Sequence, residues 1–333
     1  MKFKFGTAVI LSSSLLISQS GVYANANDSS ENNKTQTENT SKSIDFKEAQ
    51  EMSPNELTNL LTEEDLTLHN KVEDDESTES VPRIKETYQD VNAYINKHNI
   101  KPSPITQDAR MKDLPKYDYK SDKFIGVIIH ETANSNSSID SEIKYMYENY
   151  ESAFVHAYAG SNKIVQTASS DYLAWGAGAK ANPYFYQIEL ARSNTFDQFA
   201  KSVNNQAYLT AKMLKQNGLK PSLADNNSEG KGTVISHNAV SKNYGGTDHT
   251  DPISYFSQWG YDMNQFYNLV QKHYDQMNET SENNAISGTI YKVAKGDTLY
   301  NISNRSGVSI ANIKKLNNLK SNNVAIGQTL KLK

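Results

Sequence analysis

The sequence predicts an α/β fold in which a mixed central β-sheet is flanked by helices, followed by a small βααβ unit. Between residues 124 and 274, short apolar runs of strand length alternate with segments of helical periodicity. A polar spacer, residues 278–288, then precedes a strand–helix–helix–strand pattern over residues 289–333. With 333 residues, 37% of them hydrophobic and 22% charged, the chain is long enough for two folded domains.

The N-terminus has the pattern of a secretory signal peptide over residues 1–26. Lys2 and Lys4 precede an uncharged stretch that ends near the small residues Ala24 and Ala26. Serines dilute this stretch below the apolarity of a membrane anchor, so we expect export and no membrane span. The chain has no cysteine, so we expect no disulfide bonds.

The next segment, residues 27–82, is rich in Ser, Thr, Asn and Glu and poor in aromatic residues. Because such a composition buries too little apolar surface to order itself, we expect a disordered polar and acidic region. Leucines near helical spacing between Pro54 and Leu68 are compatible with one short, marginal helix. The formal net charge of −4 is too small to indicate a nucleic-acid partner, and we expect none.

The folded region, residues 83–277, contains strands where short apolar runs end at turn residues and helices where apolar residues recur every three or four positions. Gly218 ends the longest helix as a C-cap. In chain order, the predicted elements are a helix at 84–98, a strand at 124–129, a helix at 139–150, a hairpin of strands at 153–158 and 163–167, a strand at 186–191, a helix at 196–217, a strand at 234–236 and a helix at 263–274.

Residues with metal-binding side chains follow two of the predicted strands. His130 follows the apolar run 124–129, His237 follows the strand 234–236, and Asp251 lies fourteen positions after His237, beyond a Gly-Gly bend. Two imidazoles and one carboxylate can hold a catalytic zinc and leave its fourth position open. We interpret these three residues as ligands of one zinc ion. The alternative is that each is an ordinary packed or surface residue.

Zinc-assisted hydrolysis also needs a base and a group that stabilises the oxyanion. Glu189 is the candidate base because it is the polar residue of an otherwise apolar strand; the alternative is a solvent-facing glutamate. His249, two residues before Asp251, is the candidate oxyanion group; the alternative is a solvated loop residue. His156 alternates with apolar neighbours on one sheet face, either toward the site or packed in the core.

Five motifs in one order resemble those of the zinc-dependent N-acetylmuramoyl-L-alanine amidases, a family shared with phage lysozyme-type amidases and peptidoglycan recognition proteins. They lie at residues 130–134, 153–157, 171–176, 188–190 and 245–252. The last of them reads Gly-Gly-Thr-Asp-His-Thr-Asp-Pro. The resemblance covers residues 84–274 and implies an amidase-type mixed sheet flanked by helices.

Applied residue by residue, the resemblance implies that His130, His237 and Asp251 bind one Zn²⁺. It implies that Glu189 activates the water on the metal and that His249 stabilises the tetrahedral intermediate. Two substrate contacts are also implied. His156 would line the groove near the zinc, and Trp175 would form its wall unless it belongs to the core. Many relatives read Trp-His-Ala-Gly where this chain has Trp-Gly-Ala-Gly at 175–178, so a histidine contact at that position is not expected.

The C-terminal unit, residues 289–333, resembles a LysM module. It carries the stretches Gly-Asp-Thr-Leu, Asn-Asn-Leu and Gly-Gln-Thr-Leu, the first opening a helix and the last opening a strand. LysM modules bind N-acetylglucosamine-containing glycans, so the resemblance implies a second contact with the same polymer.

Together with the signal-peptide pattern, both resemblances imply a secreted, cell-wall-associated autolysin that acts on peptidoglycan. The sequence does not specify an oligomeric state, and we expect a monomer by default. The expected reaction is zinc-assisted hydrolysis of the amide between N-acetylmuramic acid and the L-alanine of the stem peptide. Two alternatives stay open. One is a peptidoglycan-binding protein without activity, although such relatives typically lack a metal ligand. The other is a zinc peptidase that cuts the stem or the cross-bridge.

Overall fold

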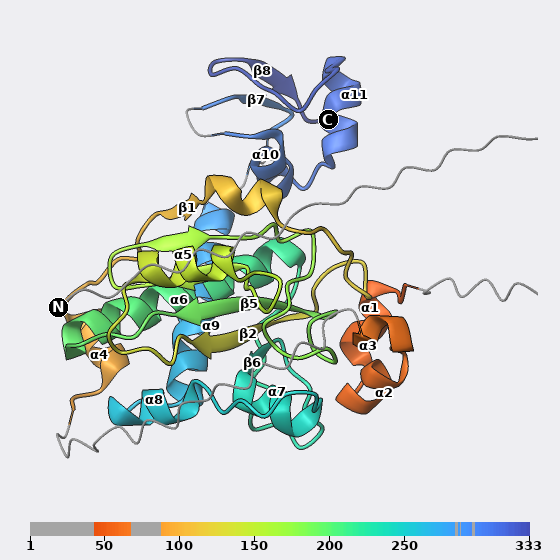
Figure 1. The fold of residues 1–333 in the computed structure, drawn as a ribbon. Helices are drawn as coiled ribbons and strands as arrows, with labels where there is room; N and C mark the ends of the chain where they lie inside the picture. Colours follow the sequence, from red (N-terminus) through yellow and green to blue (C-terminus); the bar gives the residue numbers. More distant parts are fainter. Residues whose placement is uncertain (1–42, 68–87, 284–285, 287, 295–296) are drawn as a thin grey trace, which may run out of the picture. The chain divides into compact units, whose positions relative to one another are not determined.

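The computed structural model describes residues 43–67, 88–283, 286, 288–294 and 297–333 (Figure 1). The predicted signal peptide lies outside these residues. Within them, no helix combines the length and apolarity that a membrane crossing requires. The elements are α1 (Phe46–Glu51), α2 (Pro54–Asn59), α3 (Glu63–Thr67), α4 (Val91–Lys97), β1 (Ile105–Gln107), the 3-10 helix η1 (Ala109–Asp113), β2 (Gly126–Glu131), α5 (Ile139–Glu148), β3 (Ala157–Ala159), β4 (Ile164–Gln166), β5 (Phe185–Leu190), α6 (Phe196–Asn217), β6 (Val234–Ser236), α7 (His237–Asn243), α8 (Ile253–Gln258), α9 (Met263–Asn283), β7 (Ile290–Lys292), α10 (Leu299–Ser306), α11 (Ile310–Asn317) and β8 (Thr329–Lys331).

A six-stranded sheet of order β1-β4-β3-β5-β2-β6 forms the centre of the first domain. Only the β3–β4 hairpin pairs antiparallel, so the predicted mixed sheet is confirmed. β2 lies between β5 and β6 and is parallel to both. The carboxyl ends of these three strands therefore meet at one edge of the sheet, where an α/β sheet usually places its functional residues.

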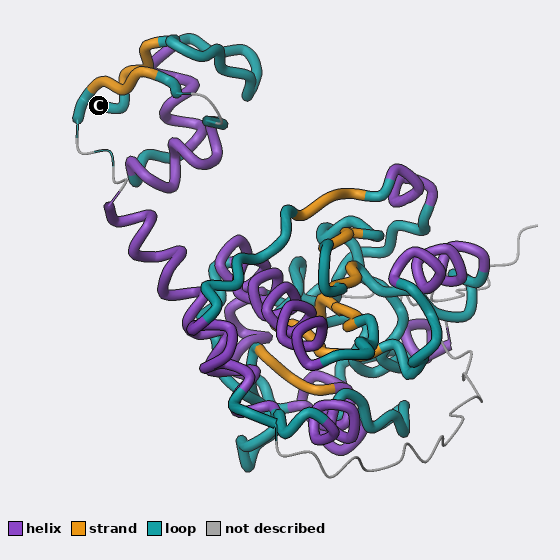
Figure 2. The backbone as a smooth tube through the Cα atoms, turned by 90° about the vertical axis from the view of Figure 1, so that its left-hand side faces the viewer, coloured by secondary structure: helices purple, strands orange, loops and turns teal. Residues whose placement is uncertain are grey.

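Alternation along β2 directs neighbouring side chains into two different cores. Val127 and Ile129 join a large core formed with α6 and α9, whereas Ile128 joins a second core formed with α7. Figures 1 and 2 show the strands between helices. Helix α6 packs against α9. All six residues of β2 are buried, which agrees with a parallel strand covered on both faces.

The longest helix of the domain has the bounds that its sequence predicts. The side chain of Thr195 accepts a hydrogen bond from the N–H of Gln198 at the first turn. Gly218 ends the helix in the left-handed conformation, with φ of +77°. Thirteen buried residues of α6, among them Phe199 and Val203, form the largest helical contribution to the core.

Residues 43–67 contradict the prediction of a disordered region over 27–82. They form α1, α2 and α3, and their side chains enter the second core: Ala49 is 0% and Leu57 1% exposed. The composition argument concerns folding in isolation, whereas this segment is ordered by the apolar face that the sheet already presents. The rest of 27–82 lies outside the described residues.

The C-terminal unit has the predicted βααβ order, and β7 pairs antiparallel with β8. Gly327 adopts a φ of +84° in the turn before β8, a conformation that favours glycine. Asn317, the last residue of α11, accepts from the N–H of Lys331 and donates to its carbonyl. The small core of this unit consists of Val293, Leu299, Ile302, Ile313, Leu330 and Leu332.

His273 of α9 is buried against α6 and makes the stability of the first domain depend on pH. Its Nε2 lies 2.9 Å from Oδ1 of Asn204, and burial lowers the pKa of His273 to about 4. The unfolded chain, with a histidine pKa near 6.5, binds this proton more readily. The contribution to stability is therefore complete above about pH 6.5 and is lost as the pH falls toward about 4.

The free energy of unfolding of the parent protein should fall between about pH 7 and about pH 4.5. In His273→Gln this fall should be smaller by roughly 2 kcal/mol. Denaturant unfolding followed by tryptophan fluorescence measures this, since Trp175 and Trp259, the two tryptophans of the chain, both lie in the first domain. The exposed His98 provides the control, His98→Gln. An unchanged pH dependence in His273→Gln would contradict the assignment.

Candidate metal centre

The ends of β2 and β6 place two histidines side by side. His130 is the fifth residue of β2, and His237 follows β6 as the first residue of α7. The register pairs Ile129 with Ser236, so the next residue on each strand lies at the same level of the sheet. The two imidazole rings have their centroids 4.5 Å apart at 71° to one another.

Asp251 reaches the same point from the loop after α7. Gly245 and Gly246 turn this loop with φ of +68° and +79°, and the N–H of Asn238 donates to the carbonyl of Asp251. Oδ1 of Asp251 lies 3.0 Å from Nδ1 of His237, and Oδ2 lies 3.4 Å from Nδ1 of His130. One ligand atom from each of the three side chains lies within 4.8 Å of the others. The structure thus brings the three predicted ligands together.

Burial and the neighbouring charges favour the metal-binding forms of these side chains. Burial, assisted by the facing His237, lowers the pKa of His130 to about 4, so His130 is neutral at neutral pH. Burial alone would raise the pKa of Asp251, but the imidazoles of His237, His130 and His249 together hold it well below its usual range. The site therefore combines a carboxylate with a neutral imidazole.

The residues present fit a zinc ion. His130 Nε2, His237 Nδ1 and Asp251 Oδ1 are buried and form no hydrogen bond of suitable geometry within the part of the chain that the structure describes, although the last two atoms lie 3.0 Å apart. Buried polar atoms of this kind are costly unless a partner satisfies them, and a cation is the partner that two nitrogens and a carboxylate oxygen share. Imidazole and carboxylate ligands, without thiolate, suit a catalytic zinc site.

Glu189 and His249, the two predicted catalytic residues, border this centre. Glu189 of β5 is in register with His130 on the adjacent parallel strand, so both side chains point to the same face of the sheet. The ring of His249 stacks on that of His237, with centroids 4.6 Å apart, and its Nδ1 lies 3.7 Å from Asp251 Oδ1. The His249 side chain is 31% exposed, so it is the most accessible of the three imidazoles.

A buried ion pair, which was not predicted from the sequence, lies next to the metal centre and contacts Asp251 through the backbone of Glu131. Glu131 and Arg192 form two hydrogen bonds of 2.6 and 2.7 Å, and both side chains are nearly inaccessible. The backbone N–H of Glu131 donates to Oδ2 of Asp251. The pair therefore ties the chain just beyond β5 to the residue next to His130. Arg192 lies two residues after β5, but only the strand register reveals that it faces Glu131.

Two further contacts fix the histidines of the candidate centre. Oγ1 of Thr247 lies 3.1 Å from Nε2 of His237 and accepts from the N–H of His249. Nε2 of Gln206, from α6, donates to the carbonyls of His130 and Ile188, at 3.0 Å each. Such outer contacts orient metal ligands and typically affect affinity by about 10- to 100-fold.

His156 does not line a groove at this site, so the prediction of a substrate contact is wrong. It is 0% exposed and stacks on Tyr186 in the large core. Its Nδ1 accepts from the N–H of Gln187, and its Nε2 lies 2.8 Å from the Tyr119 hydroxyl and 2.9 Å from the Tyr172 carbonyl. Sequence alternation assigns His156 to one sheet face but does not show which side chains cover that face.

Trp175 belongs to the core, which is the alternative stated for it. It is 8% exposed, and its ring packs edge-on against Phe154 with centroids 4.3 Å apart. Its indole N–H donates to the carbonyl of Tyr150. Trp175 therefore offers little surface to a substrate.

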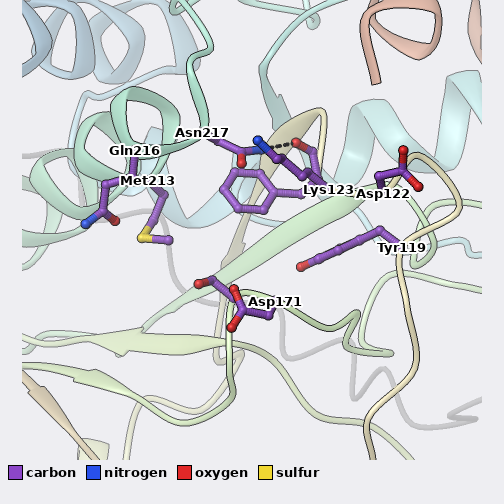
Figure 3. A pocket seen from close by; sticks show the side chains of 9 residues that line it. Tyr119, Asp122, Lys123, Asp171, Met213, Gln216 and Asn217 are labelled. Atoms are coloured by element: carbon purple, nitrogen blue, oxygen red, sulfur yellow. Dashed lines mark hydrogen bonds between the residues drawn. The ribbon is translucent and has the colours of Figure 1, made fainter. Parts of the chain in front are cut away.

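A separate pocket of about 440 Å³ lies at the other end of β2 (Figure 3). Its lining includes Phe124, which precedes β2, and Met213 and Asn217 from the end of α6. The Asn217 side chain donates to the carbonyl of Phe124. Six residues at about 3.3 Å each separate Phe124 from His130 by roughly 20 Å, so this pocket is not part of the metal centre.

Two family models match the chain. One, described as N-acetylmuramoyl-L-alanine amidase, matches residues 120–254, and the other, described as LysM domain, matches residues 291–333. The first range contains the five residues His130, Glu189, His237, His249 and Asp251.

Curated proteins and solved structures resemble the same region. Protein Ami of Listeria monocytogenes is 45% identical over 203 residues, which is 60% of this chain and 22% of that protein. The bifunctional autolysin of Staphylococcus aureus is 41% identical over 198 residues, 59% of this chain and 16% of that protein. The chain thus spans less than a quarter of the length of these relatives. A crystal structure of Staphylococcus aureus hydrolase AmiA in complex with its ligand is 40% identical, with a TM-score of 0.54, and the match covers 60% of this chain and 98% of that one.

Proposed function

Because the chain belongs to the N-acetylmuramoyl-L-alanine amidase family and carries a LysM domain, we propose that it is a secreted autolysin that cleaves peptidoglycan with zinc. The bond cleaved is the amide between N-acetylmuramic acid and the L-alanine of the stem peptide. The observation that supports this best is the convergence of His130, His237 and Asp251 at one edge of the sheet, with Glu189 in register beside His130.

His130, His237 and Asp251 would hold the zinc ion, which supplies a Lewis acid for the scissile carbonyl. The Glu189 carboxylate accepts a proton from the attacking water and passes it to the nitrogen of the leaving L-alanine. His249 donates an N–H to the carbonyl oxygen while negative charge develops on it. Its partial exposure lets it reach a substrate, while its stacking on His237 fixes the ring.

The LysM domain would hold N-acetylglucosamine-containing glycan of the same polymer. A tethered second contact raises the local concentration of substrate without changing the chemistry. The pattern of residues 1–26 supports export, and the LysM domain supports a cell-wall location. We propose catalytic and LysM domains at 83–277 and 289–333, joined by a linker at 278–288, in a monomer with no nucleic-acid partner and no membrane span.

Digestion of purified peptidoglycan, with and without a zinc chelator, tests this proposal. The expected products are intact glycan strands and stem peptides with a free L-alanine amino terminus, identified by mass spectrometry, and chelator should prevent their formation. New termini inside the stem or the cross-bridge would instead indicate a peptidase. An unchanged wall, with zinc and glycan both bound, would indicate a binding protein without activity.

A further inference from the structure

We infer that residues 43–67, termed the strap, dock on the catalytic domain and hold one wall of the metal centre in position. This inference deepens the proposed function, because the centre it concerns is that of the proposed amidase. The strap lies outside the 120–254 range of the family match. Its contacts nevertheless make it part of the same folded unit.

Lys120 fastens both ends of the strap. The carbonyl of Lys120 accepts from the N–H of Ile44 at 2.8 Å, near the start of the strap. Its ammonium group lies 2.7 Å from Oδ2 of Asp65, near the end of the strap, and the Lys120 side chain is only 5% exposed. Burial alone would raise the pKa of Asp65, but its bonds to Lys120 and Thr62 lower it, so the carboxylate is charged. Between these points, Leu57 is buried in the second core.

The strap contacts a segment that we term the wall loop, residues 176–184. The buried hydroxyl of Tyr184 donates to the carbonyl of Leu57 at 2.8 Å. The N–H of Lys120 donates to the carbonyl of Pro183, so the residue that fastens the strap also fastens the wall loop. Ala177 and Ala181 of the wall loop lie in the same core as Leu57.

The wall loop in turn packs on the glycine loop, residues 245–247, which leads to His249 and Asp251. A Cβ at Gly178 would lie 2.5 Å from the carbonyl oxygen of Gly246, so the two loops touch without room for a side chain. The N–H groups of Ala181 and Asn182 both donate to the carbonyl of Gly178, which closes the wall loop on itself. Because no gap separates the two loops, a displacement of the wall loop should displace the glycine loop as well.

Thr247 connects the glycine loop to the metal ligands. Its hydroxyl lies 3.1 Å from Nε2 of His237 and accepts the N–H of His249. Contacts therefore run from Leu57 through Tyr184 and Gly178 to Thr247 and His237. The strap acts as a positioning element for this centre, and its release should allow Thr247 and His237 to move.

Leu57→Asp in the full-length chain tests the inference, because it places a charge at a buried position of the strap. Its matched control is Leu60→Asp, at a leucine three residues further on that is 42% exposed. Release of the strap is measured by limited proteolysis, and zinc affinity by competition with a chromogenic chelator. We expect Leu57→Asp to release the strap and to raise the Kd for zinc by about 10-fold, the lower end of the range for outer-shell changes. Leu60→Asp and the conservative Leu57→Met should stay within about twofold of the parent protein.

Asp65→Lys provides a second test that leaves the cores intact, since it opposes Lys120 with a like charge at the edge of the strap. Glu64→Lys, at an exposed neighbour, has the same change in charge and is its control. If the strap is released in Leu57→Asp or in Asp65→Lys while the zinc affinity stays at the parental value, the inference is overturned. Zinc affinity is compared at a temperature at which tryptophan fluorescence shows every variant folded. Because the readout is metal affinity, a protein that binds zinc but does not cleave the wall would refute the proposed function alone.

Discussion

Glu189→Gln is expected to lower kcat on a soluble muramyl peptide by about 100- to 10,000-fold, the usual contribution of a general acid–base group. Glutamine retains the size of the side chain but accepts no proton. Glu189 is not one of the three converging ligands, so the variant should bind zinc as the parent does. A steady-state assay combined with metal analysis therefore separates loss of the base from loss of the metal.

Glu151→Gln is the matched control for this prediction, because Glu151 is an exposed residue of a turn. It should leave kcat unchanged. If Glu189→Gln retains more than about a tenth of the parental kcat with zinc bound, proton transfer by Glu189 is not the main contribution, since a general base contributes at least about 100-fold. A variant that instead fails to bind zinc would show that Glu189 supports the ligands.

The elements with strong local signals could be predicted from the sequence. Helix α6 has the predicted bounds 196–217 because its apolar spacing, its N-cap threonine and Gly218 all lie within the segment itself. The convergence of the three candidate ligands could be predicted because each follows a strand or a glycine bend, and parallel strands end at one edge. Strand β1 was missed because it reads Ile-Thr-Gln, with one apolar residue, and lies at the edge of the sheet. Helix α8 was missed because its six residues form fewer than two turns.

The contacts that depend on register or on a distant surface could not be predicted. Glu131 and Arg192 become partners only when β2 and β5 align, and no local pattern specifies that alignment. The strap lacks the apolar content to fold alone, so its composition indicates disorder, whereas the sheet face that orders it comes from residues far along the chain. The resemblance implied a groove contact for His156, whereas its alternation left packing in the core open and did not identify the tyrosines that cover it.

Asp251→Ala is expected to remove zinc binding and amidase activity together. The carboxylate lies between the two histidine ligands, with its Oδ1 3.0 Å from His237 and its Oδ2 3.4 Å from His130. It also supplies the negative charge that offsets part of the charge of the ion. The loss of affinity should therefore exceed the roughly 10- to 100-fold that outer-shell changes cause.

Thermal unfolding with and without added zinc measures the effect of Asp251→Ala independently of catalysis. A ligand that binds only the folded state at 100 times its Kd stabilises the parent protein by about 2.7 kcal/mol. Asp251→Ala should lose this zinc-dependent increase in Tm. Asp248→Ala, which removes an exposed carboxylate three residues earlier in the same loop, should retain it. Asp248 is exposed, whereas the Asp251 side chain is 11% exposed and lies between the histidines. If Asp251→Ala retains the zinc response as Asp248→Ala does, the metal does not bind between His130, His237 and Asp251. If Asp251→Ala alone loses the zinc response and also loses activity, the zinc site and the catalytic site both lie at this edge of the sheet.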